Sequence, residues 1–392
     1  MGIHFLRNPL NSPFFEIDYW KNVKKLESSL RIINEYYLDS ENVTYDELAD
    51  TAIRAMTYKL DRYSEYVVPE EFNEFAKENY GVYNGIGIEI KKMGDVAIIK
   101  EVVPDSPADQ AGLKLEDTIT HINSKKISEL NESQLVAMIR GEVNSALDLN
   151  VERQSPLENK KEFLVEIKKK EVWVESILSS TYESGSIGYL KISQFTSTTP
   201  NHFRQKYEDL VRNYSPKGII VDLRDNPGGL LQQAIELADL FFPPKETILV
   251  LQSRIPSENT AIESSDKTLK STLPMVILIN GNTSSSAELL AGVLRLKIGA
   301  QLVGEKSFGK ASIQNIFQLN RSTALKLTAA RYLLADGLNI NGVGLEPDYE
   351  VTNFVKREGE TEISRMVKSY QEIPENNPNK DFQLLKAIEL MK

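Results

Sequence analysis

A serine-rich turn at residues 280–288 contains the first side chains that could do chemistry. It follows a short apolar run, Met275 to Ile279, and precedes a helical pattern, Leu289 to Ile298. Such a turn puts small hydroxyl groups at the N-terminus of a helix, where unpaired N–H groups and the helix dipole favour developing negative charge. A serine nucleophile gains most at this position. Because Ser and Thr are also preferred helix caps, a plain cap is the simpler interpretation of this run alone.

A lysine in a second turn could activate such a serine. Lys310 follows Gly309 and precedes an alternating run, and Gln314 lies four residues later, on the same face of a strand. A lysine that is desolvated in a cleft has a lowered pKa and can serve as a general base to serine. A solvated strand lysine is the usual alternative, so this turn decides nothing by itself.

A third loop, Asp222 to Gly229, leaves a buried β-branched strand, Gly218 to Leu223, and enters a helical pattern, Leu230 to Phe242. Open α/β sheets build their sites where strands end in this way. The Pro-Gly-Gly sequence at the end of the loop lets a backbone N–H point into a cleft with no side chain in the way. That arrangement suits an oxyanion hole. A tight strand-to-helix turn is the alternative interpretation.

The histidines lie outside these three loops. They are His4, His121 and His202, so a Ser-His-Asp triad is disfavoured, and a three-His metal site more so. The chain has no cysteine, which excludes disulfides, thiolate zinc sites and a cysteine nucleophile. If a serine acts here, lysine is the best remaining base.

Length and composition are those of an ordinary soluble globular protein of about two to three domains. The chain has 392 residues, of which 41% are hydrophobic and 26% charged. Its net charge of −10 argues against nucleic acid as the main partner, since a phosphate backbone would be repelled. No run approaches the ~18 apolar residues of a membrane span. The first residues show no signal-peptide pattern, so either the protein is cytoplasmic or a targeting segment precedes this sequence.

Patterning along the chain predicts four segments. Residues 1–80 are a helical N-terminal region, with a further helix expected from Pro69, and residues 81–170 are short alternating strands with Gly and Pro between them. In residues 171–355 strands and helices alternate, which predicts a mostly parallel sheet with right-handed crossovers. Residues 356–392 are a tail that is helical at both ends. The expected fold class is therefore multi-domain α/β.

A glycine-bordered loop in the β-rich segment suggests peptide binding. Gly85 and Gly87 flank Ile86, and the run continues through Ile88 into an expected edge strand, Ile86 to Ile90. The N–H groups of such a loop can hold a terminal carboxylate while the strand edge adds the peptide to the sheet. A plain hairpin entry is the alternative.

Taken together and in this order, the segments resemble the carboxy-terminal processing (tail-specific) peptidases, which are serine proteases with an inserted PDZ domain. The resemblance covers nearly the whole chain, from residue 30 to residue 350. It is carried by residues 60–66, 85–88, 106–113, 222–229, 280–288, 308–314 and 342–348.

This resemblance implies a serine endopeptidase of the Ser-Lys type. By position, Ser285 is the nucleophile, Lys310 is the general base, and Gln314 orients that lysine. The oxyanion hole would consist of the backbone N–H groups of Gly228 and Ser286. Relatives usually alternate Ser and Ala in the serine turn, and the serine at 286 is tolerable because only its backbone acts.

The same resemblance assigns the peptide site and its regulation. The loop of Gly85, Ile86, Gly87 and Ile88 would hold the carboxylate of the substrate, and Arg140 would link occupancy of the PDZ domain to the active site. Also implied are a crotonase/ClpP-like α/β core, no cofactor or metal, and unstructured or tail-tagged protein substrates with apolar C-termini. A homo-oligomer and an extracytoplasmic location in the periplasm or cell envelope complete these expectations.

Two other classes of function are open at this point. A peptide-binding scaffold that has lost its activity would keep the PDZ loop, but it would not need the intact set of Ser285, Lys310 and Gln314. A crotonase-like acyl-transfer enzyme would explain the oxyanion loop, but it would not explain the β-rich block.

Overall fold

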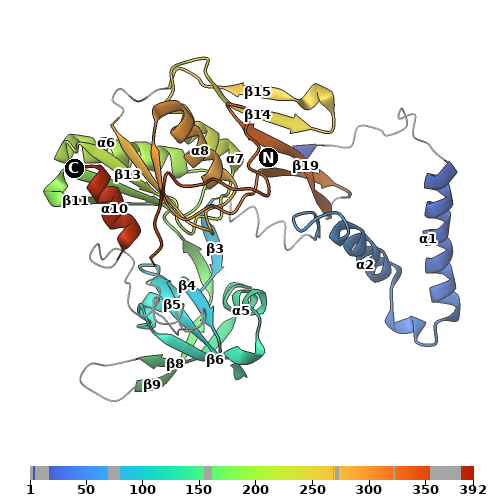
Figure 1. The fold of residues 1–392 in the computed structure, drawn as a ribbon. Coiled ribbons are helices and arrows are strands. Elements are labelled where there is room, and N and C mark those ends of the chain that lie inside the picture. The colour runs from blue at the N-terminus through green and yellow to red at the C-terminus, as the bar shows by residue number, and fades with distance from the viewer. Residues whose placement is uncertain are drawn as a thin grey trace, which may run out of the picture. The chain divides into compact units, whose positions relative to one another are not determined.

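The computed structural model describes residues 3–4, 17–68, 80–153, 161–267, 269, 273–320, 323–353 and 381–392 (Figure 1). The chain divides into two compact units, each assembled from separate stretches. The first unit contains Met1–Asn73, Leu249–Ile262 and Ala311–Asn341, and the second contains Glu74–Ile248, Glu263–Lys310 and Gly342–Lys392. Among the described residues, no helix is both long enough and apolar enough to cross a membrane.

The first unit combines two helices, α1 (Ile17–Tyr36) and α2 (Tyr45–Tyr58), with a sheet. Helix α2 begins with a capping box, in which Thr44 and Glu47 each accept a hydrogen bond from the backbone N–H of the other. The further helix expected from Pro69 falls outside the described residues. The sheet has the order β1-β18-β19-β14-β15, and β2 also pairs with β19. Its strands are β1 (Ile3–His4), β2 (Glu65–Val67), β14 (Thr247–Ser253), β15 (Thr260–Glu263), β18 (Ser312–Gln318) and β19 (Ala324–Leu334).

The second unit contains a β-rich part, as the short alternating strands expected in residues 81–170 predicted. The sheet has the order β4-β5-β6-β8-β9, with β7 paired to β6, and a separate ribbon joins β3 to β10. The strands are β3 (Val82–Gly85), β4 (Ile88–Met93), β5 (Val96–Val102), β6 (Thr118–Ile122), β7 (Lys125–Lys126), β8 (Ala146–Arg153), β9 (Lys161–Lys168) and β10 (Lys170–Trp173). The helices are α4 (Pro107–Gln110) and α5 (Glu132–Ile139).

One expectation for this part was wrong. The strand predicted from Ile86 to Ile90 is broken, because β3 ends at Gly85 and β4 begins only at Ile88. Gly87 lies between them with a φ of +83°, and a Cβ atom there would lie 2.3 Å from Cβ of Ser106. The backbone therefore turns at Gly87, and Ile86 is buried in the core of the sheet and its helices.

The remainder of the second unit is a parallel-rich α/β layer, as expected. Its sheet has the order β11-β12-β13-β16-β17-β20, in which only the β11–β12 pair is antiparallel. The strands are β11 (Ile177–Tyr182), β12 (Ile187–Ile192), β13 (Gly218–Asp222), β16 (Met275–Ile279), β17 (Gln301–Gly304) and β20 (Tyr349–Glu350). The helices are α6 (Thr199–Tyr214), α7 (Leu231–Asp239), α8 (Ser286–Ile298) and α10 (Phe382–Leu390). Short 3-10 helices in the described residues span Ser40–Asn42, Ile127–Glu129, Glu183–Gly185 and Pro256–Glu258.

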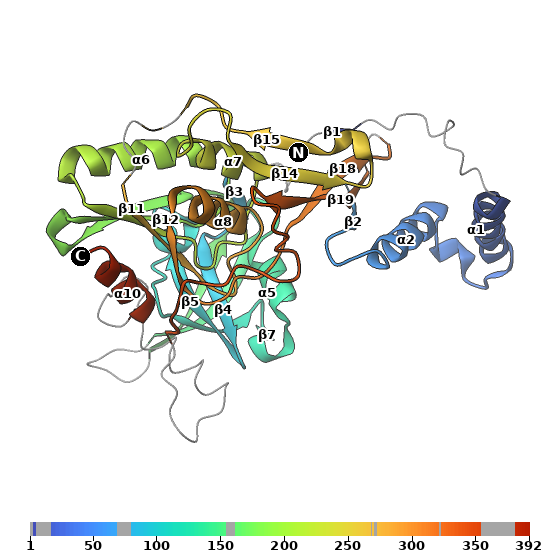
Figure 2. The ribbon, with the colours of Figure 1, turned by 45° about the horizontal axis from the view of Figure 1, so that its top comes forward.

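Helices cover both faces of this sheet. Figure 2 shows α6, α7 and α8 on one face and α10 on the other. The strand residues that pack against α10 alternate with those that point away, as the two-residue period of a strand requires. Tyr189 and Ile220 are on the α10 side, in one cluster with Leu384, Ala387 and Ile388 of the helix. Helix α10 confirms the expected helix at the end of the tail, whereas the start of the tail falls outside the described residues.

Candidate active site

Three of the predicted loops follow neighbouring strands of the α/β sheet. Strands β13, β16 and β17 are adjacent and parallel, so the loops that leave their carboxyl ends meet at one edge. Backbone hydrogen bonds connect the loops directly. Ser284 N–H donates to the carbonyl oxygen of Asn226 at 2.9 Å, and Phe308 N–H donates to that of Thr283 at 3.0 Å. The serine turn therefore lies between the glycine loop and the lysine turn.

Ser285 lies at a strained point of the backbone. It is the residue before α8 and has a φ of 57° and a ψ of −119°. A non-glycine residue rarely adopts a positive φ, and such strain is concentrated at functional positions. The next residue begins a helix of 13 residues, whose N-terminus favours negative charge beside the serine hydroxyl. The position is thus more than an ordinary cap, because an ordinary cap residue has extended backbone angles.

Gly228 lies directly against Ser285. A Cβ atom at Gly228 would be 2.8 Å from Cβ of Ser285 and 2.9 Å from the carbonyl oxygen of Ser284. Gly229 is equally confined, since its Cβ would lie 2.3 Å from the carbonyl oxygen of Phe195. Both glycines also have positive φ angles, of 101° and 135°. Only glycine fits at these two positions, because a side chain would displace the serine turn at Gly228 and the backbone of Phe195 at Gly229.

The N–H group of Gly228 is already engaged inside its own loop. It donates to Oδ1 of Asn226 at 2.8 Å. Asn226 is completely buried, and its Nδ2 donates to the carbonyl oxygen of Ile192 at 2.8 Å. An oxyanion bound at Gly228 would have to share or replace the bond to Asn226. Sequence reasoning gave Asn226 no role, because nothing local marks its side chain as a partner of the glycine.

Glu288 connects the serine turn to the lysine turn. Its carboxylate is completely buried and accepts hydrogen bonds from both sides. Oε2 accepts from the backbone N–H groups of Ser285 at 2.9 Å and Lys310 at 2.8 Å. Oε1 accepts from the N–H of Gly309 at 2.7 Å and from Oγ of Ser307 at 2.5 Å. One side chain thus fixes the backbone positions of the predicted nucleophile and of the predicted base.

A second segment supports the lysine turn from outside. Gly342 N–H donates to the carbonyl oxygen of Gly309 at 2.8 Å, and Leu345 N–H donates to Oγ of Ser307 at 2.7 Å. A Cβ atom at Gly309 would lie 2.8 Å from the backbone nitrogen of Gly344. This close packing explains why glycines occur in both segments.

Gln314 lies in the first unit, on β18. It is 6% exposed, and its Nε2 donates to Oγ of Ser312 at 3.0 Å and to Oγ1 of Thr328 at 3.1 Å. Its predicted contact with Lys310 joins residues of two different units and stays a prediction.

The predicted peptide loop lies beside an edge of the β4-β5-β6-β8-β9 sheet, as far as the described residues show. Strand β4 is the last strand of its sheet and pairs with β5. The carbonyl groups of the loop are bonded inward, since Ile86 accepts from Ala108 N–H at 2.8 Å and Gly87 accepts from Val103 N–H at 2.9 Å. A Cβ atom at Gly85 would lie 3.4 Å from the carbonyl oxygen of Ile139, at the end of α5. The loop thus lies between an edge strand and a helix.

Comparison with known proteins agrees with this geometry. Residues 186–351 match the model of peptidase family S41, and residues 98–153 match that of the PDZ domain. The chain is also 31% identical over 329 residues to the carboxy-terminal processing protease CtpA of Bacillus subtilis, a match that covers 83% of this chain and 68% of that protein. The chain belongs to peptidase family S41.

Two further comparisons agree with this assignment. A probable CtpA-like serine protease of Staphylococcus aureus is 32% identical over 333 residues, covering 84% of this chain and 65% of that protein. The photosystem II D1 C-terminal processing protease has the same fold, with a TM-score of 0.54 at 21% identity over 83% of this chain and 92% of that one. This S41 chain thus spans about two thirds of the length of these curated relatives, 65% and 68%.

Arg140 of this S41 chain lies where the PDZ part meets the α/β part. Its guanidinium lies over the ring of Tyr83, 4.8 Å from the ring centroid. The hydroxyl of Tyr83 donates to Oε1 of Gln194, in the loop after β12. The carbonyl oxygen of Arg140 accepts from Nζ of Lys169 at 2.7 Å, and burial lowers the pKa of that lysine. Arg140 is thus held at its guanidinium by Tyr83 and at its backbone carbonyl by Lys169.

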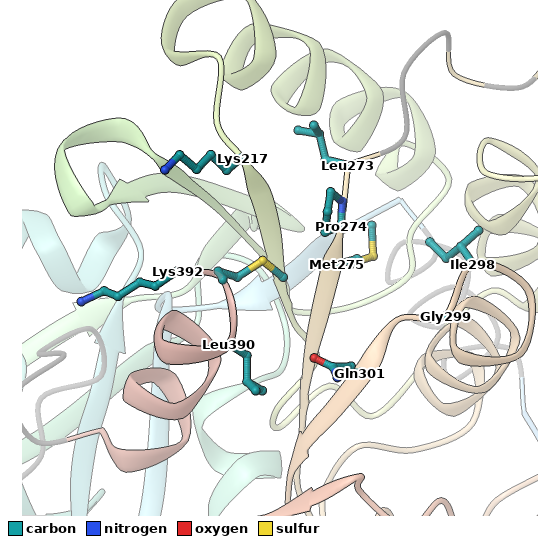
Figure 3. A pocket seen from close by; sticks show the side chains of 10 residues that line it. Lys217, Leu273, Pro274, Met275, Ile298, Gly299, Gln301, Leu390 and Lys392 are labelled. Carbon is teal, nitrogen blue, oxygen red and sulfur yellow. The ribbon is translucent and has the colours of Figure 1, made fainter.

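A pocket of about 550 Å³ lies at the opposite end of the S41 α/β sheet (Figure 3). It is formed where β13, β16 and β17 begin and where α10 ends, whereas the three loops follow the carboxyl ends of these strands. The pocket is therefore separate from the candidate active site. Its lining residues are Lys217, Leu273, Pro274, Met275, Ile298, Gly299, Gln301, Leu390, Met391 and Lys392.

Proposed function

We propose that this S41 family member is a serine endopeptidase that uses Ser285 as nucleophile and Lys310 as general base. The observation that carries the proposal is the carboxylate of Glu288, which bonds the backbone N–H groups of both residues through one oxygen atom. The strained backbone of Ser285 at the N-terminus of α8 supports the same assignment. In this arrangement the nucleophile and its base are held by one rigid connection.

The proposed reaction has two halves. Nζ of Lys310 takes the proton from Oγ of Ser285 as that oxygen attacks the scissile carbonyl carbon, and the leaving amine is protonated as the acyl-enzyme forms. Water then attacks the ester, and the serine regains its proton. Backbone N–H groups of Gly228, or its neighbour Gly229, and of Ser286 stabilise the oxyanion in each half. Gln314 orients the lysine.

The PDZ domain selects the substrate in this proposal. It comprises residues 81–170, between a helical N-terminal region, 1–80, and the catalytic core, 171–355, which the tail 356–392 follows. Residues Gly85 to Ile88 hold the terminal carboxylate of an unstructured or tail-tagged protein, and the edge of β4 pairs with its apolar last residues.

Arg140 couples this capture to the active site. The supporting contacts run from Arg140 through Tyr83 to Gln194, the residue before Phe195. Phe195 N–H donates to the carbonyl oxygen of Gly228 at 2.8 Å, so a shift at Tyr83 reaches the glycine loop within two bonded steps. A peptide that moves the end of α5 would therefore alter the oxyanion loop.

Assembly and location are further parts of the proposal. Helix α1 leaves large apolar side chains exposed, among them Trp20 at 52% and Tyr36 at 78%, which is consistent with a homo-oligomer formed through this helix. Family membership favours an extracytoplasmic location, in the periplasm or cell envelope.

The deciding experiment compares Ser285→Ala, Lys310→Ala and a control, Ser284→Ala, on an unstructured protein that ends in apolar residues. We expect the first two variants to lose about 10⁴-fold or more in kcat with unchanged thermal unfolding, and the control to keep most of its activity. The same substrate with two terminal aspartates should be cleaved more slowly. Cleavage by Ser285→Ala or Lys310→Ala at the rate of the unaltered protein would refute the dyad.

A peptide-binding scaffold without activity is the second candidate. The bond between the Gly228 N–H and Asn226 favours it, because this donor is occupied in the structure. Mass spectrometry of the incubated substrate separates the two. A scaffold leaves the substrate intact while retaining it, and an endopeptidase yields fragments with new termini.

A further inference from the structure

A buried chain of ion pairs joins the C-terminal helix to the loop beside Ser285. Arg224 Nη2 donates to Oδ2 of Asp222 at 2.6 Å, and its Nε lies 3.0 Å from Oδ1 of the same residue. On the other side, Nη1 of Arg224 pairs with Asp381 at 2.8 Å and donates to Oε1 of Gln383 at 3.1 Å. Asp222 ends β13, whereas Asp381 immediately precedes α10. Two segments 157 residues apart therefore share one guanidinium.

The partners of Arg224 are buried, whereas 14% of the Arg224 side chain is exposed. Asp222, Asp381 and Gln383 are 1%, 3% and 2% exposed. Burial alone lowers the pKa of Arg224, but the charges of Asp222 and Asp381 outweigh burial and hold that pKa well above its usual range. The guanidinium therefore stays charged, and its donors need fixed partners.

Asp381 is the second carboxylate that Arg224 contacts, while Asp222 also experiences the positive charge of Lys191. Asp381 is itself held in place, since its Oδ1 accepts from Leu384 N–H at 3.0 Å and from Nδ2 of Asn353 at 3.1 Å. What Asp381 contributes is a fixed direction for Nη1 of Arg224.

The direction of Arg224 matters because the glycine loop follows it. Asp225 has a positive φ of 60°, and the next residue, Asn226, bonds the N–H of Gly228. The backbone of Arg224 is also held, since its N–H donates to Oδ1 of Asp222 at 2.9 Å. Arg224 is thus joined to Gly228 through Asp225 and Asn226, and Gly228 lies against Ser285.

We propose that Asp381 and Gln383, at the start of α10, are positioning residues that hold Arg224 and, through it, the glycine loop of residues 225–229. The inference rests on the proposed peptidase function. Under this proposal α10 both packs its apolar face on the sheet and supplies polar groups that hold Arg224.

The test uses Asp381→Ala, the nearly isosteric Asp381→Asn, and a matched control on the exposed side of the same helix, Glu389→Ala. Kinetics on the unstructured substrate are combined with hydrogen exchange of the amides in residues 223–230. For Asp381→Ala we expect kcat to fall about 10²-fold with KM within twofold, because small displacements of a catalytic loop have effects of that size. Exchange in residues 223–230 should rise at least tenfold, and the control should change neither quantity.

Formate separates positioning from general loss of stability. A small carboxylate that enters the space left by Asp381→Ala should restore part of kcat in a saturable way and slow the exchange, whereas it should not affect Glu389→Ala. A variant that melts earlier but keeps its kcat and its exchange rates overturns the proposal. If Asp381→Ala does not fold, Asp381→Asn and Gln383→Met decide by the same two measurements.

The exchange measurement keeps this inference apart from the proposed function. If the unaltered protein cleaves nothing, the peptidase proposal fails, and faster exchange in Asp381→Ala still demonstrates the connection from α10 to the loop. If the unaltered protein cleaves and Asp381→Ala retains both kcat and slow exchange, the peptidase stands and the positioning role is refuted.

Discussion

Among single residues, Glu288 has the most concentrated set of contacts in the candidate site. Four donors from the serine and lysine turns meet on two oxygen atoms that water does not reach. Such a fully satisfied buried group makes the surrounding backbone rigid, because each donor would be left unpaired if the carboxylate moved. The proposed nucleophile and base are therefore positioned before any substrate binds.

The variant Glu288→Gln tests this role. An amide has one oxygen and an NH2 group in place of the second oxygen. It therefore cannot accept from all four groups, and its NH2 group would face other hydrogen-bond donors. We expect kcat to fall about 10²-fold and the free energy of unfolding to fall by about 1–3 kcal/mol. Steady-state kinetics and urea unfolding measure the two effects.

Glu346→Gln is the matched control for this change. Glu346 is exposed and pairs with Lys306, also at the surface, so its loss should be nearly neutral. Equal kinetics for Glu288→Gln and the unaltered protein would show that the shared carboxylate is dispensable.

At the scale of elements, the end of β13 is stabilised by charge as well as by the sheet. Asp222 is buried and accepts a hydrogen bond from the hydroxyl of Tyr189 at 2.8 Å in addition to those from Arg224. Burial raises the pKa of Asp222, but the charge and hydrogen bonds of Arg224 outweigh burial and lower the pKa below its usual value. The carboxylate is therefore ionised in the folded state more readily than in the unfolded chain.

This lowered pKa predicts a specific dependence of stability on pH. The contribution of Asp222 is fully present above its unfolded pKa, about 3.9, and is lost as the pH falls through the lower folded pKa. At pH 7, Asp222→Asn should lower the free energy of unfolding by about 3–5 kcal/mol, because it leaves a buried charge with one partner fewer. Urea unfolding from pH 7 to pH 3 should show the difference from the unaltered protein shrinking in acid. A difference that is constant over this range would contradict the assignment.

Local sequence patterns were sufficient to predict most of the helices and strands of the second unit. Strand Met275–Ile279 was predicted with the bounds observed, because a short buried strand followed by a serine-rich turn leaves a strong local signal. The helix predicted over Leu289–Ile298 ends as expected and begins three residues earlier, at Ser286. The break at Gly87 was missed, and the residue that lies against Gly87 is Ser106, nineteen residues away. Local periodicity contains no information about such a contact.

The sequence predicted some parts of the candidate site and missed others. The Ser285 and Lys310 turns could be located from residue types, order and the absence of a nearby histidine. Glu288 could have been assigned its role from its capping-box position, three residues after Ser285. The ion pair between Arg224 and Asp381 could not be predicted from the sequence. These residues are 157 positions apart and come together only in the folded protein.

At the scale of the whole molecule, a short series of contacts within the second unit connects the PDZ part to the loops of the candidate active site. Its central member is Tyr83, whose ring packs under Arg140 and whose hydroxyl reaches Gln194. Only the hydroxyl group makes the second contact, so the two halves of this connection can be separated by a single substitution.

The variant Tyr83→Phe makes that separation. We expect the Kd for a peptide with an apolar C-terminus to stay within twofold, because the ring and its contact with Arg140 remain. Cleavage of a substrate with the same C-terminus should slow about fivefold to tenfold, the effect of losing about 1 kcal/mol or more of coupling. Calorimetry of peptide binding and kinetics on the tailed substrate measure both. Unchanged kinetics would exclude this route.

The sheet of the first unit pairs strands that are synthesised far apart in time. Its sheet pairs β2 with β19, and Lys326 reaches Glu65 across 261 residues of sequence. At about 5–20 residues per second, synthesis of the intervening chain takes roughly 10 to 50 seconds, during which β2 has no partner strand. Such distant pairing also folds slowly, since a large loop must close before any contact stabilises it.

Lys310 is made only two residues before β18 begins, so the proposed base and the last strands of the first unit emerge together. On the proposed mechanism, a nascent chain cannot cleave its neighbours until Lys310 and the strands that follow it have been synthesised.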